Sequence, residues 1–180
     1  MPFPANWLEE LLVEWLELQG FTISTSVSVP APPGGKWTPD VVGARLDREG
    51  HLLIRHCEAS MWLIQAPSKV AAKFADKFSQ KVEAAVRDHF AAIFGQGAGE
   101  QARYEKWVVI CGASKNVKQA LKEVIPSLEI CTFDSFIVNQ VLKSISDWRS
   151  PPRKTYTTLP SDKWLLCQID QLKRSGLIKL

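Results

Sequence analysis

"PDVVGARLDREGHLLIRHCEAS", residues Pro39–Ser60, decides the fold because it encodes two strands joined by a tight turn. In its centre, the tripeptide REG at 48–50 suits a three-residue hairpin loop in which glycine takes the left-handed position. Runs rich in apolar residues flank that loop, over Asp40–Leu46 and Leu52–Glu58. We therefore expect an antiparallel hairpin near the start of a sheet.

The turn fixes which residues of the hairpin face each other. A loop over 48–50 pairs Asp47 with His51, so the residue numbers of every facing pair add up to 98, as those of Asp40 and Glu58 do. Facing residues share one side of the sheet, with Cβ atoms roughly 4.5–5.5 Å apart. Two carboxylates this close repel each other unless a cation lies between them, and Mg²⁺ suits a site with few protein ligands. The alternative is that the strands are shifted or frayed and that both acids are solvated.

Helix and strand patterns continue on both sides of the hairpin. Before it, Asn6 and Glu9 form a capping pair for a helix that Gly20 ends, and an alternating strand covers Phe21–Val29. After it we expect a long helix at about 68–94, a strand at 106–114, a helix at 115–125, a strand at 128–133, and helices at 134–148 and 162–175. The fold class is therefore α/β: a mixed central sheet with an α-β-β-β-α-β core, plus C-terminal helices. Residues 1–150 form the domain, and residues 151–180 form a linker and a C-terminal helix that packs on the same domain.

Composition and charge describe an ordinary globular domain. The chain has 180 residues, 46% of them hydrophobic and 23% charged, and its net charge of +3 leaves any nucleic-acid affinity to a local basic patch. The four cysteines (Cys57, Cys111, Cys131, Cys167) form no CxxC pair, so we expect reduced thiols in the core. No signal peptide opens the chain and no apolar run reaches membrane length, which predicts a cytoplasmic protein without a membrane partner. The GxGxxG, GxSxG, HExxH and Walker motifs are missing, so nothing supports the enzyme classes that depend on them.

The second strand of the hairpin carries polar residues on one face. His56, Glu58 and Ser60 project from that face, because side chains alternate along a strand. A lysine two positions after the carboxylate would orient a water and stabilise negative charge in a phosphoryl-transfer step. His56 is open to two interpretations: a neighbour or general base of a metal site, or a hydrogen-bonded core residue.

These residues carry a resemblance to a known family. The dipeptide PD at 39–40, followed after seventeen residues by EAS at 58–60, resembles the motif of the PD-(D/E)XK nuclease superfamily, which has the restriction-endonuclease-like fold. The predicted element order agrees with the α-β-β-β-α-β core of that fold. The resemblance covers the chain from about residue 6 to residue 112.

The resemblance implies a metal site. It makes Asp40 and Glu58 ligands of Mg²⁺ (or Mn²⁺), and the backbone carbonyl of Ala59 a further ligand. A glutamate of the first helix often completes such a site. Glu10 and Glu14 lie on one flank of that helix, and Glu14 is the predicted residue because it is nearer the core edge. The alternative is that both glutamates lie on a solvated helix face.

Ser60 departs from the family pattern, which has lysine at this position. Either the lysine has moved or the site is catalytically silent. The helix that follows carries lysine at every fourth position: Lys69, Lys73, Lys77 and Lys81. If that helix begins just beyond Ser60, Lys73 lies about 6–8 Å into it and within reach of the acids, so we predict that Lys73 supplies the cation. Lys36, in the loop before the hairpin, is a second candidate.

The lysine row has two other interpretations. It is a solvated helix face, which is the usual place for such a run. Alternatively, it holds a nucleic-acid backbone, since lysines contact phosphates without reading the base sequence. In that interpretation the predicted phosphate contacts are Lys36, Lys69, Lys73 and Lys77.

The expected function follows from the resemblance. It is Mg²⁺-dependent hydrolysis of phosphodiester bonds in DNA, with RNA as a weaker alternative substrate. Nucleases of this superfamily often work as dimers, which makes a homodimer possible. The competing class is a nuclease-fold module that has lost its lysine and binds nucleic acid or a protein partner without catalysis.

Overall fold

A five-stranded mixed sheet forms the centre of the computed structural model, which describes residues 6–24, 27–29, 38–150 and 158–178. The strands lie in chain order: β1 (Thr22–Ser24), β2 (Val41–Leu46), β3 (Leu52–Leu63), β4 (Arg103–Ala113) and β5 (Leu128–Thr132). β1, β2 and β3 pair antiparallel, whereas β4 and β5 continue parallel to β3. The predicted α/β class with a mixed sheet is confirmed.

The predicted register of the hairpin is also confirmed. The pairs run from Val41 opposite Cys57 to Leu46 opposite Leu52. Gly50 has the positive φ of 83° that the turn requires. A local signal of one glycine and two apolar runs was therefore sufficient to set the pairing.

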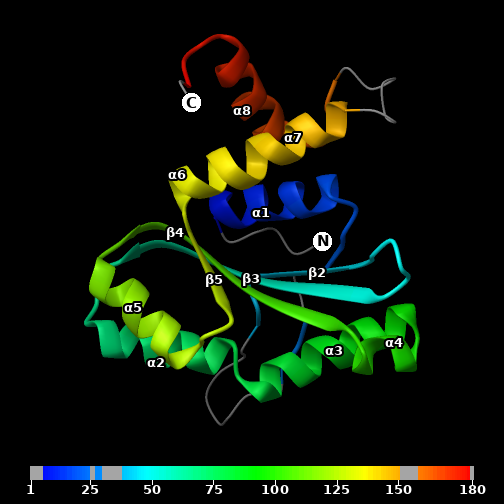
Figure 1. The fold of residues 1–180 in the computed structure, drawn as a ribbon, viewed down its shortest axis with the longest axis vertical. Helices are drawn as coiled ribbons and strands as arrows, with labels where there is room; N and C mark the ends of the chain where they lie inside the picture. Colours follow the sequence, from blue (N-terminus) through cyan, green and yellow to red (C-terminus); the bar gives the residue numbers. More distant parts are fainter. Residues whose placement is uncertain (1–5, 25–26, 30–37, 151–157, 179–180) are drawn as a thin grey trace.

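Helices cover both faces of the sheet, so the described chain has three layers (Figure 1). One layer contains α1 (Trp7–Leu18), α6 (Phe133–Phe136), the π-helical turn η1 (Ile137–Val141), α7 (Leu142–Arg149) and α8 (Trp164–Arg174). The opposite layer contains α2 (Pro67–Lys77), α3 (Gln80–Phe94), α4 (Gln96–Glu100) and α5 (Lys115–Val124). None of the described helices is both long and apolar enough to cross a bilayer.

The alternation along β3 divides its side chains between the two layers. Leu53 and Cys57 belong to the core under α1, while Ile54 belongs to the core under α3. His56 and Glu58 therefore point toward α2 and α3, because they share the parity of Ile54. Both are fully buried.

The first helix begins as predicted. The Asn6 side chain accepts hydrogen bonds from the backbone of Leu8 and Glu9 at 3.0 and 3.1 Å, and its amide donates to Glu9 Oε1 at 2.6 Å. These bonds satisfy backbone N–H groups that the first turn of a helix leaves unpaired.

The single long helix predicted for 68–94 is wrong, because the chain breaks into α2 and α3 at Phe78–Ser79. Ser79 is extended, with φ of −63° and ψ of 158°, and a new helix starts after it. Apolar periodicity did not reveal the break because Phe74, Phe78 and Val82 are all buried on the sheet side. The two helices nevertheless pack into different clusters: α2 against α5, and α3 against β2 and β3.

All four cysteines are free thiols. Cys57 and Cys131 are buried, whereas Cys111 and Cys167 are half-buried. Burial raises the pKa of Cys57 to about 12 and that of Cys131 to about 11, so both are protonated at neutral pH.

Candidate functional site

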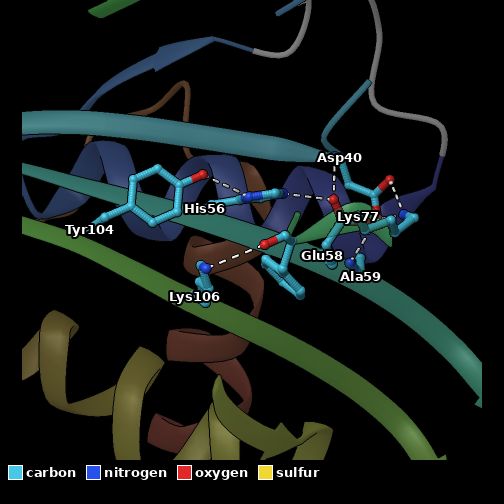
Figure 2. Close-up of polar contacts among 8 residues, drawn as sticks. Asp40, His56, Glu58, Ala59, Lys77, Tyr104 and Lys106 are labelled. Atoms are coloured by element: carbon cyan, nitrogen blue, oxygen red, sulfur yellow. Dashed lines mark hydrogen bonds and ion pairs between the residues drawn. The ribbon is translucent and has the colours of Figure 1, made fainter. Parts of the chain in front are cut away.

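Asp40, Glu58 and Lys77 meet on the α2 side of the hairpin (Figure 2). Asp40 immediately precedes β2, and its backbone N–H donates to Glu58 Oε1 at 3.4 Å. Lys77 is the last residue of α2, and its ammonium lies 3.1 Å from Asp40 Oδ1 and in contact with Glu58 Oε2. The two acids therefore share one face, as the hairpin register predicts, with a lysine between them.

In each carboxylate, one oxygen is bound by a neighbouring donor and the other oxygen faces Lys77. The backbone N–H of Ala59 donates to Asp40 Oδ2 at 2.9 Å, and His56 Nε2 lies 2.8 Å from Glu58 Oε1. The remaining oxygens, Asp40 Oδ1 and Glu58 Oε2, converge on the Lys77 ammonium. We call these two the converging oxygens. They form an oriented pair of hard donors aimed at a single cation.

The positive charge in the site is too small to keep the pKa values of its two acids at their ordinary level. Burial, and then the negative charge of Glu58, raise the pKa of Asp40 to about 6. Burial also raises the pKa of Glu58, whose side chain is 0% exposed. Burial alone would lower the pKa of Lys77, but the two carboxylates outweigh it and the net direction is upward. One ammonium thus only partly offsets two desolvated carboxylates.

A buried histidine and a tyrosine stand behind Glu58. His56 Nδ1 lies 2.9 Å from the Tyr104 hydroxyl, and the imidazole centroid is 4.5 Å from that of Phe78. Burial, and then the charge of Lys77, lower the pKa of His56 to about 3, so the ring is neutral. His56 is therefore a hydrogen-bonded core residue with both nitrogens occupied.

A small pocket adjoins Glu58 and Lys77. Thr38, Pro39, Glu58, Lys77 and Val82 line it, and its volume is about 10 Å³. That volume is close to the room one water molecule needs. The Lys77 side chain is 21% exposed and Asp40 is 19% exposed, so the ammonium side of the site is the side that reaches solvent.

Lys73, predicted to supply the cation, does not occupy that place, and Lys77 does. Lys73 and Lys69 are exposed on α2, one and two turns before Lys77. The prediction failed because β3 continues to Leu63 and α2 begins only at Pro67. From Glu58 the strand rises ~16 Å to its end, and the ten residues of helix that return to Lys77 rise ~15 Å. Lys73 is therefore one turn short of the acids.

Glu14, predicted to complete the site, lies elsewhere. It is buried, and its two oxygens accept hydrogen bonds from the backbone of Leu165 and Leu166 at 3.1 and 2.9 Å. These N–H groups belong to the first turn of α8, whose own N-cap residue, Lys163, makes no side-chain capping bond. Glu14 therefore caps α8 from another helix.

Three other predicted residues have different outcomes. Lys36 lies outside the described residues. Ala59 adjoins the site through its N–H, while the ligand role of its carbonyl stays a prediction. Ser60 is half-buried on β3, two positions beyond Glu58.

A second acidic group, at the tip of the hairpin, has a simpler explanation. Asp47, Glu49 and His51 bring one ligand-type atom each within 4.8 Å of one another, and all three are exposed. Asp47 Oδ1 accepts from the backbone of Glu49 and His51 at 2.9 Å each. These are the bonds of the turn itself.

No family model, curated protein or solved structure matches this chain.

Proposed function

We propose that this chain is a Mg²⁺-dependent nuclease that hydrolyses phosphodiester bonds in DNA. The observation that carries the proposal is the convergence of the Asp40 and Glu58 carboxylates on the ammonium of Lys77. Together with Pro39, these residues supply the Pro-Asp, Glu and Lys of the PD-(D/E)XK pattern, with the lysine coming from α2 in place of Ser60.

The arrangement of elements supports the same proposal. The order of α1, β1, β2, β3, then the helices α2, α3 and α4, and then β4 agrees with the α-β-β-β-α-β core of the restriction-endonuclease-like fold when the three consecutive helices are taken as one helical segment. The break after Lys77 contributes as well, because it leaves this lysine at the C-terminal end of α2, next to the hairpin. We infer that the chain has this fold and that its motif lysine has moved to the helix.

The donor set fits Mg²⁺ or Mn²⁺. Asp40 and Glu58 would hold the cation through the converging oxygens. N–H donors from Ala59 and His56 already orient each carboxylate by binding its other oxygen. When bound, such a cation lowers the pKa of a coordinated water and offsets negative charge on phosphate oxygens. DNA is the proposed partner because a phosphodiester supplies those oxygens.

Lys77 has a defined role in this scheme. Its side chain is partly exposed and lines the small pocket beside Glu58, so we infer that it can turn from the carboxylates toward solvent. There it would donate hydrogen bonds to an oxygen of the scissile phosphate or to the attacking water. His56 is a poor general base, because both of its nitrogens are engaged in the interior.

A cleavage assay tests the proposal. Wild type, Asp40→Asn and Lys77→Ala are incubated with duplex, junction, flap and single-stranded DNA in Mg²⁺ or Mn²⁺, with EDTA as the blank. Lys81→Ala is the matched control, because Lys81 is an exposed lysine only four positions after Lys77, in the first turn of α3. We expect both site variants to lose at least ~100-fold in rate and the control to stay within about twofold of wild type. Cleavage that survives Asp40→Asn overturns the metal-site proposal, and a wild type that binds DNA without cutting it favours the catalytically degenerate module.

A further inference from the structure

The Glu58 carboxylate ends a hydrogen-bonded chain that begins at Tyr104 (Figure 2). The Tyr104 hydroxyl lies 2.9 Å from His56 Nδ1, and His56 Nε2 lies 2.8 Å from Glu58 Oε1. His56 and Glu58 are neighbours on β3, while Tyr104 comes from β4, opposite Ile54. We call this series the Tyr–His–Glu relay.

The partners fix the direction of each hydrogen bond. As a carboxylate paired with Lys77, Glu58 can only accept, so His56 Nε2 carries the proton and donates. The other nitrogen of the ring, Nδ1, is then an acceptor, and the Tyr104 O–H donates to it. The relay therefore runs from the hydroxyl, through the imidazole, to Glu58 Oε1.

Packing holds the relay in place. The Phe78 ring lies against the imidazole with a centroid distance of 4.5 Å. The Tyr104 ring has Arg87 at 5.3 Å and Lys106 at 5.8 Å from its centroid. Both of these cations pair with Glu83, at 2.9 and 3.0 Å. The far end of the relay is thus anchored on a second group of ion pairs, on α3 and β4.

The relay decides which oxygen Glu58 presents. His56 Nε2 binds Oε1, which leaves Oε2 directed at the Lys77 ammonium. Without that bond Oε1 keeps, among the described residues, only the longer contact from the Asp40 N–H, at 3.4 Å, and the carboxylate is less restricted about its final torsion, since such terminal torsions have broad preferences. Because the relay orients the carboxylate in advance, the binding of a cation costs less conformational entropy.

We propose that Tyr104 and His56 are positioning residues that hold the Glu58 carboxylate in its cation-binding orientation. This rests on the proposed metal-dependent function, and it assigns a role to two residues outside the PD-(D/E)XK pattern. The alternative is that Tyr104 and His56 are hydrogen-bonded core residues with a purely structural role. In that case removing the relay lowers stability but leaves the cation affinity of the folded protein unchanged.

Mn²⁺ binding, followed by the spin-resonance signal of the free ion, separates these cases. Tyr104→Phe keeps the ring and removes only the hydroxyl, while His56→Leu removes the donor and keeps a similar volume. His56→Gln restores an N–H donor. The matched control is Val86→Ala, a packing change at a fully buried residue of α3 outside the relay. The free energy of unfolding and the DNA cleavage rate are measured on the same samples.

The expected result is a 10–100-fold loss of Mn²⁺ affinity in His56→Leu, the range typical when a partner of a metal ligand is removed, and a smaller loss in Tyr104→Phe, because the hydroxyl acts on Glu58 through His56. His56→Gln should stay within about fivefold of wild type, and Val86→Ala should lose stability without losing affinity. If wild type binds Mn²⁺ and cleaves DNA while Tyr104→Phe and His56→Leu bind as wild type does, the relay proposal is overturned and the nuclease proposal stands. A wild type that neither binds Mn²⁺ nor cleaves overturns both.

Discussion

The ammonium nitrogen of Lys77 lies 3.1 Å from Asp40 Oδ1, although the two residues are 37 positions apart in the chain. The same ammonium contacts Glu58 Oε2, so it occupies the point on which the converging oxygens are aimed. A lysine at that point holds the site together when no dication is present. It also competes with any dication for the same two oxygens.

Replacing Lys77 by methionine should therefore separate stability from cation affinity. In EDTA, Lys77→Met should lower the free energy of unfolding by about 3 kcal/mol, because it leaves two buried carboxylates without their cation. Mn²⁺ should bind this variant at least ~10-fold more tightly than wild type, since no ammonium has to be displaced. Urea unfolding with and without Mn²⁺ measures both quantities.

The control for this experiment is Lys81→Met, which changes the same residue type at an exposed position. It should stay within about 0.5 kcal/mol of wild type. If Lys77→Met were as stable as wild type in EDTA, the ion pairs of the site would contribute nothing to folding, and an unchanged Mn²⁺ affinity would show that the ammonium does not compete with the dication.

The acids of the site were predictable because their placement is local. The loop at 48–50 sets the register, and the register places Asp40 opposite Glu58 without reference to the rest of the chain. Two facing carboxylates repel each other, so both can be ionised only if a cation lies close to them. The sequence therefore indicates a cation between the two acids, but the lysine at that place is Lys77 and not the predicted Lys73.

The partners of the acids were not predictable because they depend on where elements end and on long-range pairing. Lys77 is selected over Lys73 by a strand that extends to Leu63, and apolar alternation does not mark that end. Tyr104 reaches His56, which lies 48 positions earlier in the chain, through the parallel pairing of β3 and β4. Glu14 carries the charge of a metal ligand, but it is committed to α8, which lies more than 150 positions further on.

The pH dependence of stability should report the raised pKa of Asp40. An acid whose pKa rises on folding, here from 3.8 to about 6, binds its proton more tightly in the folded state. The folded state therefore loses stability as the pH rises through that window. Wild type should lose about 2–3 kcal/mol relative to Asp40→Asn between about pH 3.5 and about pH 6.5, in EDTA.

Urea unfolding at a series of pH values checks this slope. Saturating Mg²⁺ should remove most of the loss at the upper end, because a cation favours the ionised acid. A wild type and an Asp40→Asn variant with parallel pH profiles would show that Asp40 ionises as freely in the folded chain as in the unfolded one.

Glu14 should matter for the C-terminal helix and not for the cation. Glu14→Ala removes the acceptor of two backbone N–H groups of α8, so we expect a loss of about 2 kcal/mol in the free energy of unfolding. In Glu14→Ala, hydrogen exchange of the backbone N–H groups of Leu165 and Leu166 should accelerate, while the Mn²⁺ affinity should stay within twofold of wild type. Glu10→Ala is the matched control, because Glu10 accepts a hydrogen bond from the indole of the exposed Trp164 and not from a backbone N–H of α8 among the described contacts, and it should lose about 0.5 kcal/mol or less. If Glu14→Ala folds but no longer binds Mn²⁺, the original prediction that Glu14 belongs to the metal site would be supported.

Lys69 and Lys73 should contribute to DNA affinity through phosphates rather than to cleavage chemistry. Both are exposed on α2, and each step of four residues toward Lys77 advances ~6 Å along the helix. Each phosphate contact adds about 0.9 to the slope of log affinity against log salt concentration. Lys69→Ala and Lys73→Ala should each lower that slope by about this amount on a duplex, measured by fluorescence anisotropy in EDTA between about 50 and about 300 mM KCl, and Mn²⁺ affinity should not change. Lys143→Ala, an exposed lysine of α7 in the opposite layer, should leave the slope unchanged. Equal slopes for all four proteins would mean that the lysines of α2 do not face the DNA.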